Sequence, residues 1–201
     1  MHISEGVLAP AVLTGGMALA AAGTAVGLKK LDYEAIPRVG ILSAAFFVAS
    51  LIHVPVGPVG LHLVLNGLMG LLLGWLAFPA ILIALLLQAL LFQFGGLTVL
   101  GVNTLAMAGP AVLCFHLYRP FLRRGGWWAT GAAFACGASA IFLSGLMVAL
   151  ALLFTGEAFL KVAELIILAH IPVMVVEGLI TLIIFGFLQK VRPEMLEAIY
   201  G

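Results

Sequence analysis

Residues 128–154 read WATGAAFACGASAIFLSGLMVALALLF, a stretch without a single charged side chain. A helix needs about 20 mostly apolar residues to cross the hydrocarbon core of a bilayer. This stretch therefore predicts a transmembrane helix, and the rest of the chain repeats its character. Six further apolar stretches approach the same length, at 7–28, 36–52, 62–78, 80–94, 97–117 and 159–188.

Composition supports a membrane protein. Of the 201 residues, 64% are hydrophobic and only 8% are charged, whereas soluble domains average roughly 45–50% apolar and about 25% charged residues. So few charges cannot cover the surface of a soluble domain, and the apolar excess excludes a disordered chain. The long continuous runs favour helices over a barrel, and a near-neutral charge without a basic run argues against nucleic-acid binding.

We therefore predict an all-α integral membrane protein, a compact bundle of seven transmembrane helices. Residues 1–201 form one transmembrane domain, headed by a polar segment at 1–6 that lacks the basic start of a signal peptide. The stretches 62–78 and 80–94 predict a tight helical hairpin that turns at Pro79.

The basic residues predict the orientation of this bundle. All but Lys161 follow the first, fifth or seventh stretch: Lys29, Lys30, Arg38, Arg119, Arg123, Arg124, Lys190 and Arg192. With seven helices these residues share one side of the membrane, and the positive-inside rule makes that side the cytoplasm. The N-terminus is then outside and the C-terminus is cytoplasmic.

The first five residues, Met1-His2-Ile3-Ser4-Glu5, contain a ready chelate. The α-amine of Met1, the backbone nitrogen of His2 and an imidazole nitrogen of His2 can close adjacent five- and six-membered rings around a divalent ion. Nitrogen-rich planar coordination suits Ni(II) or Cu(II), and three donors leave a fourth position open. The alternative is an ordinary exposed histidine at a frayed terminus.

A second segment, IHVPVGPVGLHL at 52–63, lies between two apolar stretches on the same predicted face as Met1. Its prolines and glycines can fold it back into the membrane as irregular backbone lining a cavity. His62 can then point toward the terminus as a further ligand, or be a helix-start histidine bonded to backbone. His53 is better explained as an interfacial residue, with a lesser prospect of being a ligand.

Polar residues also occur deep in the apolar stretches. His170 and Glu177 are seven residues apart and so share one helix face. An intramembrane carboxylate suggests a functional site, although a polar contact that fixes helix packing explains it equally well. Asn103 is a candidate partner for either residue, and Asn66 and Gln88 are weaker polar marks.

Three motifs taken together resemble the NikM/CbiM family, the substrate-binding membrane component of energy-coupling-factor (ECF) importers for nickel and cobalt. They are MHISEG at 1–6, Gly60-Leu61-His62, and HIPVMVVEG at 170–178. The resemblance implies a metal bound by the Met1 amine, the His2 backbone nitrogen, the His2 ring and His62. It also implies a prokaryotic cytoplasmic (inner) membrane, a transmembrane coupling (T) subunit, two ATPase subunits and a separate small accessory membrane subunit.

The chain departs from the family at two places near this site. A Ser or Thr that often precedes the Gly–His pair is missing, and His53 falls about where many relatives carry Asn. These departures leave room for His53 at the site and leave open the choice between nickel and cobalt. Glu5 and Asn66 are the candidates to orient the imidazoles from outside the ligand set.

Two other functions remain open from the residues alone. One is an intramembrane haem or redox protein that uses His116 and His170, although His116 lies near the cytoplasmic edge. The other is a stand-alone transporter with His170 and Glu177 as a proton relay. No nucleophile–base pair is visible, so we expect no enzyme and no cofactor, with Ni²⁺ or Co²⁺ as the transported substrate.

Overall fold

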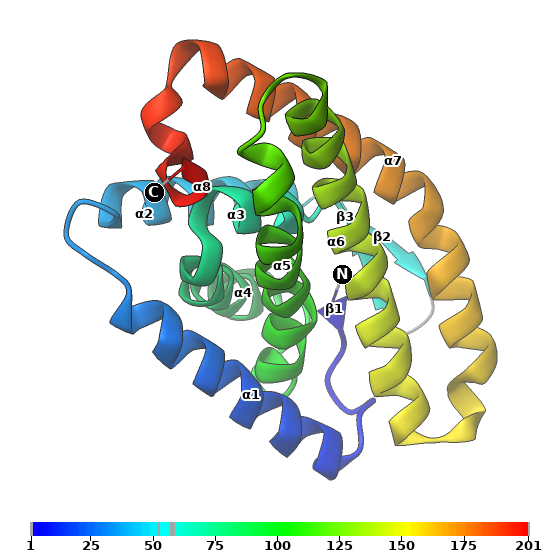
Figure 1. Ribbon diagram of the computed structural model, residues 1–201. Coiled ribbons are helices and arrows are strands. Elements are labelled where there is room, and N and C mark those ends of the chain that lie inside the picture. Colours follow the sequence, from blue (N-terminus) through cyan, green and yellow to red (C-terminus); the bar gives the residue numbers. More distant parts are fainter. Residues whose placement is uncertain (1, 52, 57–58, 201) are drawn as a thin grey trace.

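The computed structural model describes residues 2–51, 53–56 and 59–200, with residues 53–56, 59–61 and 157 described by their backbone alone. Helices dominate the described residues (Figure 1). They are α1 (Pro10–Lys29), α2 (Ile36–Ala49), α3 (Asn66–Leu73), α4 (Ala77–Phe92), α5 (Leu100–Leu122), α6 (Gly126–Thr155), α7 (Leu160–Val191) and the short α8 (Glu197–Tyr200). The short 3-10 helices are η1 (Gly74–Leu76), η2 (Glu157–Phe159) and η3 (Pro193–Leu196), and the strands are β1 (His2–Ile3), β2 (His53–Val56) and β3 (Val59–His62).

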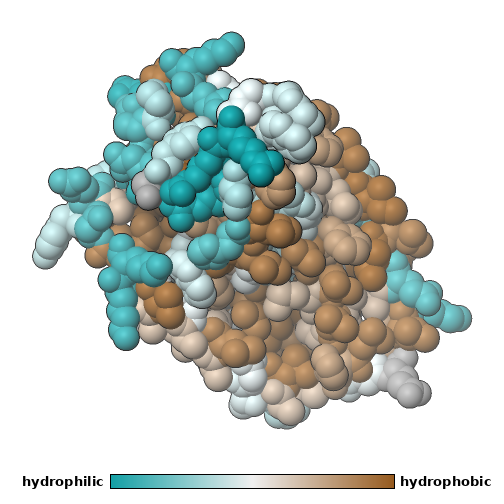
Figure 2. Space-filling model, viewed as in Figure 1, coloured by the Kyte–Doolittle hydropathy of each residue, from teal (hydrophilic) through white to brown (hydrophobic). Residues whose placement is uncertain are grey.

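The seven apolar helices α1 to α7 fit the predicted helix count. Five helical stretches of the described chain are long and apolar enough to cross a membrane: α1, the continuous stretch Asn66–Phe92, α5, α6 and α7. The helix α2 is apolar but shorter. On the face shown in Figure 2, hydrophobic residues cover most of the lower and right-hand surface, and hydrophilic residues gather near the C-terminal end of the chain. This distribution is the one expected of a protein with lipid around its flanks.

The helical hairpin exists, but the prediction of its turn was wrong. The chain reverses at η1, where Gly74 has a φ of 54°, a conformation that residues with a Cβ rarely adopt. Pro79 instead lies in the first turn of α4, where its missing N–H leaves no helical hydrogen bond unmade. The start of α3 and the C-terminal half of α4 lie close together, because His62, just before α3, and Gln88 of α4 each contact His2.

The segment around residues 53–62 is more regular than predicted. Rather than irregular backbone, β2 and β3 form an antiparallel pair in which His53 lies opposite His62. The N-terminal β1 adds to the other edge of β3, with His2 opposite Gly60, so the strand order is β1-β3-β2. Valines suit this extended backbone, and the pairing satisfies backbone groups in apolar surroundings.

The short helix α3 lies so close to α5 and α6 that backbone atoms of the helices are in contact. It packs against α5 and α6, and a Cβ on Gly70 would overlap the carbonyl of Ala111 in α5. Helices in lipid associate by such close approach at small residues, because burial from water is not available as a driving force. This packing fixes the start of α3, and with it His62, inside the bundle.

Candidate metal-binding site

The structure brings the two predicted histidine ligands together. The ring centroids of His2 and His62 are 4.5 Å apart, and only 7% and 5% of these residues are exposed. The β1 strand (Figure 1) holds His2 within the bundle, because β1 pairs with β3, Ile3 bonds to Asn103 of α5, and His2 contacts Gln88 of α4. Sixty residues of sequence separate the pair, and the β1–β3 pairing closes that gap.

The nitrogens of His62 have different environments. Nδ1 lies 2.8 Å from the carbonyl oxygen of Leu63, and because a carbonyl only accepts, Nδ1 carries the proton. Nε2 therefore keeps its lone pair. That atom is buried and has no hydrogen-bond partner among the residues that the structure describes. A buried nitrogen without a partner is unfavourable, and it is positioned to donate to a cation.

The other ring, that of His2, is oriented by Gln88. His2 Nε2 lies 2.7 Å from Oε1 of Gln88. The orientation of this amide is fixed by its other end, since Nε2 of Gln88 donates to the carbonyl of Phe47 at 3.2 Å and to the hydroxyl of Ser50. The amide oxygen therefore accepts from His2 Nε2–H. This leaves Nδ1 of His2 with the lone pair, and Nδ1 is the nitrogen that closes a six-membered chelate ring with the backbone nitrogen of the same residue.

A buried asparagine holds the strand that carries His2. Oδ1 of Asn103 accepts the backbone N–H of Ile3 at 2.9 Å, and its Nδ2 donates to the Ile3 carbonyl at 3.1 Å. Two residues later, the N–H of Glu5 donates to the carbonyl of Gly95 at 3.2 Å. The described part of the terminus is thus fixed in the bundle rather than frayed. The predicted pairing of Asn103 with His170 or Glu177 was wrong, because both ends of its amide bond to Ile3.

The two residues expected to orient the imidazoles have other contacts. The carboxylate of Glu5 accepts the backbone N–H of Thr98 at 2.9 Å and the Thr98 hydroxyl at 3.1 Å, and these bonds hold the pKa of Glu5 below its usual value. Glu5 thereby fastens the N-terminal segment at the surface. Asn66 donates to Ser144 Oγ at 2.8 Å and to the Met107 carbonyl at 3.1 Å.

The orienting role thus falls to Gln88 and the carbonyl of Leu63. In the sequence, Gln88 stood out only as a polar residue in an apolar stretch, with no assigned role. A single glutamine in an apolar helix does not reveal which distant side chain it bonds, so its role emerges only from the folded chain.

Glu177 stabilises the backbone that directly follows His62. Its side chain is fully buried on α7, and its two carboxylate oxygens accept the backbone N–H of Leu65 at 2.9 and 3.0 Å. The N–H of Val64 donates to the same carboxylate. Leu65 has a φ of 54°, so this carboxylate holds an unusual turn just after His62. These are the contacts of a residue that fixes packing.

His170 lies on the same helix and is also buried, with 2% of the residue exposed. Its Nδ1 donates to the carbonyl of Ile166 at 2.5 Å, one turn earlier on α7. Its ring packs against Gly145 of α6. This pairing of a side chain with its own helix again favours the packing interpretation of the predicted intramembrane pair.

Two predicted ligands fall outside the residues whose side chains the structure describes. Met1 lies outside the described chain, and His53 is placed only by its backbone, opposite His62. Within the described residues no group of three or more His, Cys, Asp or Glu side chains gathers to hold a metal. The described side chains thus bring together two candidate nitrogen ligands, those of His2 and His62.

Several known proteins resemble this chain over nearly its whole length. A protein of Haemophilus influenzae is 44% identical over 199 residues, which cover 98% of this chain and 97% of that protein. The cobalt transport protein CbiM of Sorangium cellulosum is 32% identical, with 98% and 95% covered. A crystal structure of a transition metal transporter superposes with a TM-score of 0.83 at 29% identity, covering 95% of this chain and 93% of that one. The family model for CbiM, the cobalt uptake substrate-specific transmembrane region, matches residues 2–195, and the chain belongs to this family.

Proposed function

We propose that this chain captures Ni²⁺ or Co²⁺ with high affinity, as the substrate-specific component of an ECF-type, ATP-driven importer. Membership of the family makes it a membrane component of cobalt or nickel uptake. The proposed ligands are the Met1 amine, the His2 backbone nitrogen, His2 Nδ1 and His62 Nε2. One observation carries the proposal: the buried, unpartnered Nε2 of His62 lies beside the ring of His2.

The chemistry of this donor set favours late first-row divalent ions. Four nitrogens in and near one plane suit Ni(II) and Cu(II), and imidazole binds these metals well. The hydrogen bonds that His2 Nε2 donates to the Gln88 oxygen and that His62 Nδ1 donates to the Leu63 carbonyl fix the tautomers of the two rings. Because the metal displaces protons from the amine and the His2 amide, binding is expected to strengthen as pH rises.

The proposed transport cycle begins outside the cell. With the N-terminus outside and the C-terminus cytoplasmic, the metal site faces the medium, and the basic loops face the cytoplasm. The sequence carries no Gly-rich phosphate-binding motif, so ATP hydrolysis belongs to two ATPase subunits that act through a T subunit. A separate small accessory membrane subunit completes the complex. A Rhodobacter capsulatus relative, 38% identical over 120 residues that are 56% of this chain, is named a fused nickel transport protein NikMN, which supports such association.

A metal titration of the purified protein with its native N-terminus tests the proposal. The native chain is expected to bind one Ni²⁺ or Co²⁺, whereas His2→Ala, His62→Ala and a chain extended by one residue before Met1 lose binding. His116→Ala serves as the matched control, because His116 contacts Trp75 and Phe115 rather than the site. Unchanged affinity in the extended chain would exclude the amine as a ligand.

The His116→Ala variant and an uptake assay test the two alternatives. A haem protein would lose its visible spectrum in His116→Ala, and a stand-alone proton-coupled transporter would take up metal without any ATPase. The contacts of Glu177 with backbone N–H groups and of His170 with its own helix favour neither alternative.

A further inference from the structure

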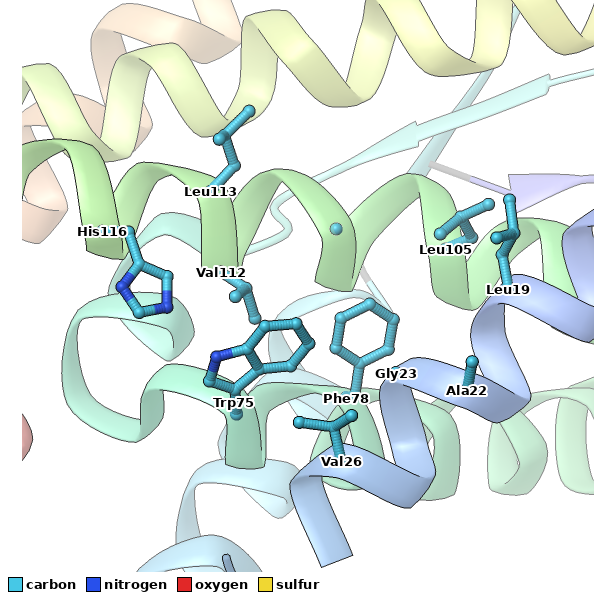
Figure 3. Close-up of a pocket in the computed structure, with 11 residues that line it drawn as sticks. Leu19, Ala22, Gly23, Val26, Trp75, Phe78, Leu105, Val112, Leu113 and His116 are labelled. Carbon is cyan, nitrogen blue, oxygen red and sulfur yellow. The ribbon is translucent and has the colours of Figure 1, made fainter.

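An apolar groove of about 420 Å³ lies away from the metal site, on the flank of the bundle. It runs between α1 and α5, and its floor is formed where η1 joins α4 (Figure 3). Leu19 and Leu105 line one end, Trp75 and Phe78 line the middle, and His116 lies at the other end. Its volume is that of a typical small-molecule site.

A polar pocket of about 260 Å³ lies beside the His116 end of the groove. Trp75 and His116 line both cavities, so the two lie next to each other. The polar pocket is lined by Lys30, Arg38 and Arg119, which come from the two basic loops and the helix ends beside them. An apolar channel that ends in a cluster of cations matches an amphiphile with an anionic head.

The charges of this pocket are incompletely matched. Its lining includes three cations but a single carboxylate, that of Asp32, which accepts the N–H of Ala35 at 2.7 Å. Glu197 lies 3.7 Å from the outer end of Arg38 and is itself largely exposed. The Nε–H of Arg38 is buried, with no acceptor among the described residues. An acceptor-rich group with negative charge would satisfy it.

We propose that these two adjacent cavities together bind one anionic glycerophospholipid. Its phosphate lies among Lys30, Arg38 and Arg119, and an acyl chain lies along the groove between α1 and α5. A phosphate offers several acceptor oxygens and is a favoured partner of arginine, and basic pockets between membrane helices are sites for lipid head groups. The inference is independent of the metal site.

Trp75 provides a direct reporter, because it lines both cavities. The chain has three tryptophans, so the double variant Trp127→Phe/Trp128→Phe leaves Trp75 as the sole indole. This protein is placed in phosphatidylcholine nanodiscs with increasing fractions of brominated phosphatidylglycerol or brominated phosphatidylcholine, and quenching of fluorescence is measured. Half-maximal quenching is expected at a mole fraction roughly five-fold lower for the anionic lipid, about the effect of one cation near a membrane surface.

Substitutions then locate the head and the tail. Lys30→Gln and Arg38→Gln should each remove most of the preference for the anionic lipid. Lys29→Gln should not, because Lys29 is the exposed last residue of α1, next to Lys30, but does not line the pocket. Val26→Phe, which fills the groove, should reduce quenching by both lipids.

Several results would overturn the proposal. Equal quenching by the two lipids would mean ordinary annular lipid, and a preference lost equally in Lys29→Gln would mean bulk surface charge. Loss of the preference on adding inorganic phosphate would mean a site for free anions. Failure of either lipid to reach Trp75 would mean that another component occupies the groove.

Discussion

The replacement of Asn103 by leucine tests how strongly metal binding depends on the docked N-terminal strand. Leucine has nearly the same size but cannot bond to Ile3, so the change removes two buried hydrogen bonds. Each such bond contributes about 1 kcal/mol, and a buried backbone group left unpaired costs about 1–3 kcal/mol. The docked strand is therefore expected to lose about 2–4 kcal/mol of stability.

This loss lowers affinity because only chains with β1 in place can bind. The apparent dissociation constant rises as the fraction of chains with a docked β1 falls. Once undocked chains are in the majority, each further ~1.4 kcal/mol of lost stability weakens binding by a factor of about ten. We expect Ni²⁺ affinity, measured by competition with a chelator at constant pH, to fall at least about tenfold in Asn103→Leu. Asn103→Asp keeps the oxygen that accepts the Ile3 N–H and should fall between this variant and the native chain.

The control is the next residue along the chain. Thr104 is also buried on α5, but its hydroxyl has no hydrogen-bond partner among the described residues. Thr104→Val should leave affinity unchanged. If folded Asn103→Leu bound Ni²⁺ as tightly as the native chain, the reasoning that a docked β1 is needed would be refuted.

Three further predictions concern the supports of the site. Gln88→Leu removes the partner of His2 Nε2 and should weaken Ni²⁺ binding by about 10- to 100-fold in the same competition assay; native affinity would show that Gln88 does not orient the ring. Glu177→Leu leaves the N–H groups of Val64 and Leu65 unpaired and should lower the melting temperature more than Glu177→Gln, which keeps one carbonyl oxygen; equal melting temperatures would count against this role. Gly70→Ala forces a contact with the Ala111 carbonyl and should reduce the free energy of unfolding by about 1–3 kcal/mol, whereas Gly15→Ala, with open space around it, should be neutral or slightly stabilising.

The helices were predictable because their signal is spread over many residues. Long uncharged runs such as 128–154 fix a helix by length and hydropathy alone, and the structure places α6 at Gly126–Thr155. The turn of the hairpin was misplaced because a proline is a stronger turn signal in a sequence than one glycine, whereas the structure has the positive φ at Gly74. Gly74 is one of the 24 glycines of the chain, and nothing in the sequence singles it out for that role.

The site was partly predictable for a different reason. His2 and His62 were recognisable from residue chemistry and from the resemblance to a known family, and the structure brings their rings together. The strands were missed because β1 covers two residues, which is too short for any periodicity. Asn103 and Gln88 gave no clue to their partners, since each bonds to a residue more than 80 positions away.

The most direct test of the account asks whether the first nitrogen of the chain is a ligand. Labelling all methionines with ¹⁵N marks seven α-nitrogens, of which the account places only the Met1 amine on the metal. Cu²⁺, which shares the preference for planar nitrogen donors, is bound as a paramagnetic probe and its hyperfine couplings are recorded. The account predicts one directly coordinated ¹⁵N in labelled protein, and a spectrum identical to that of unlabelled protein would contradict it.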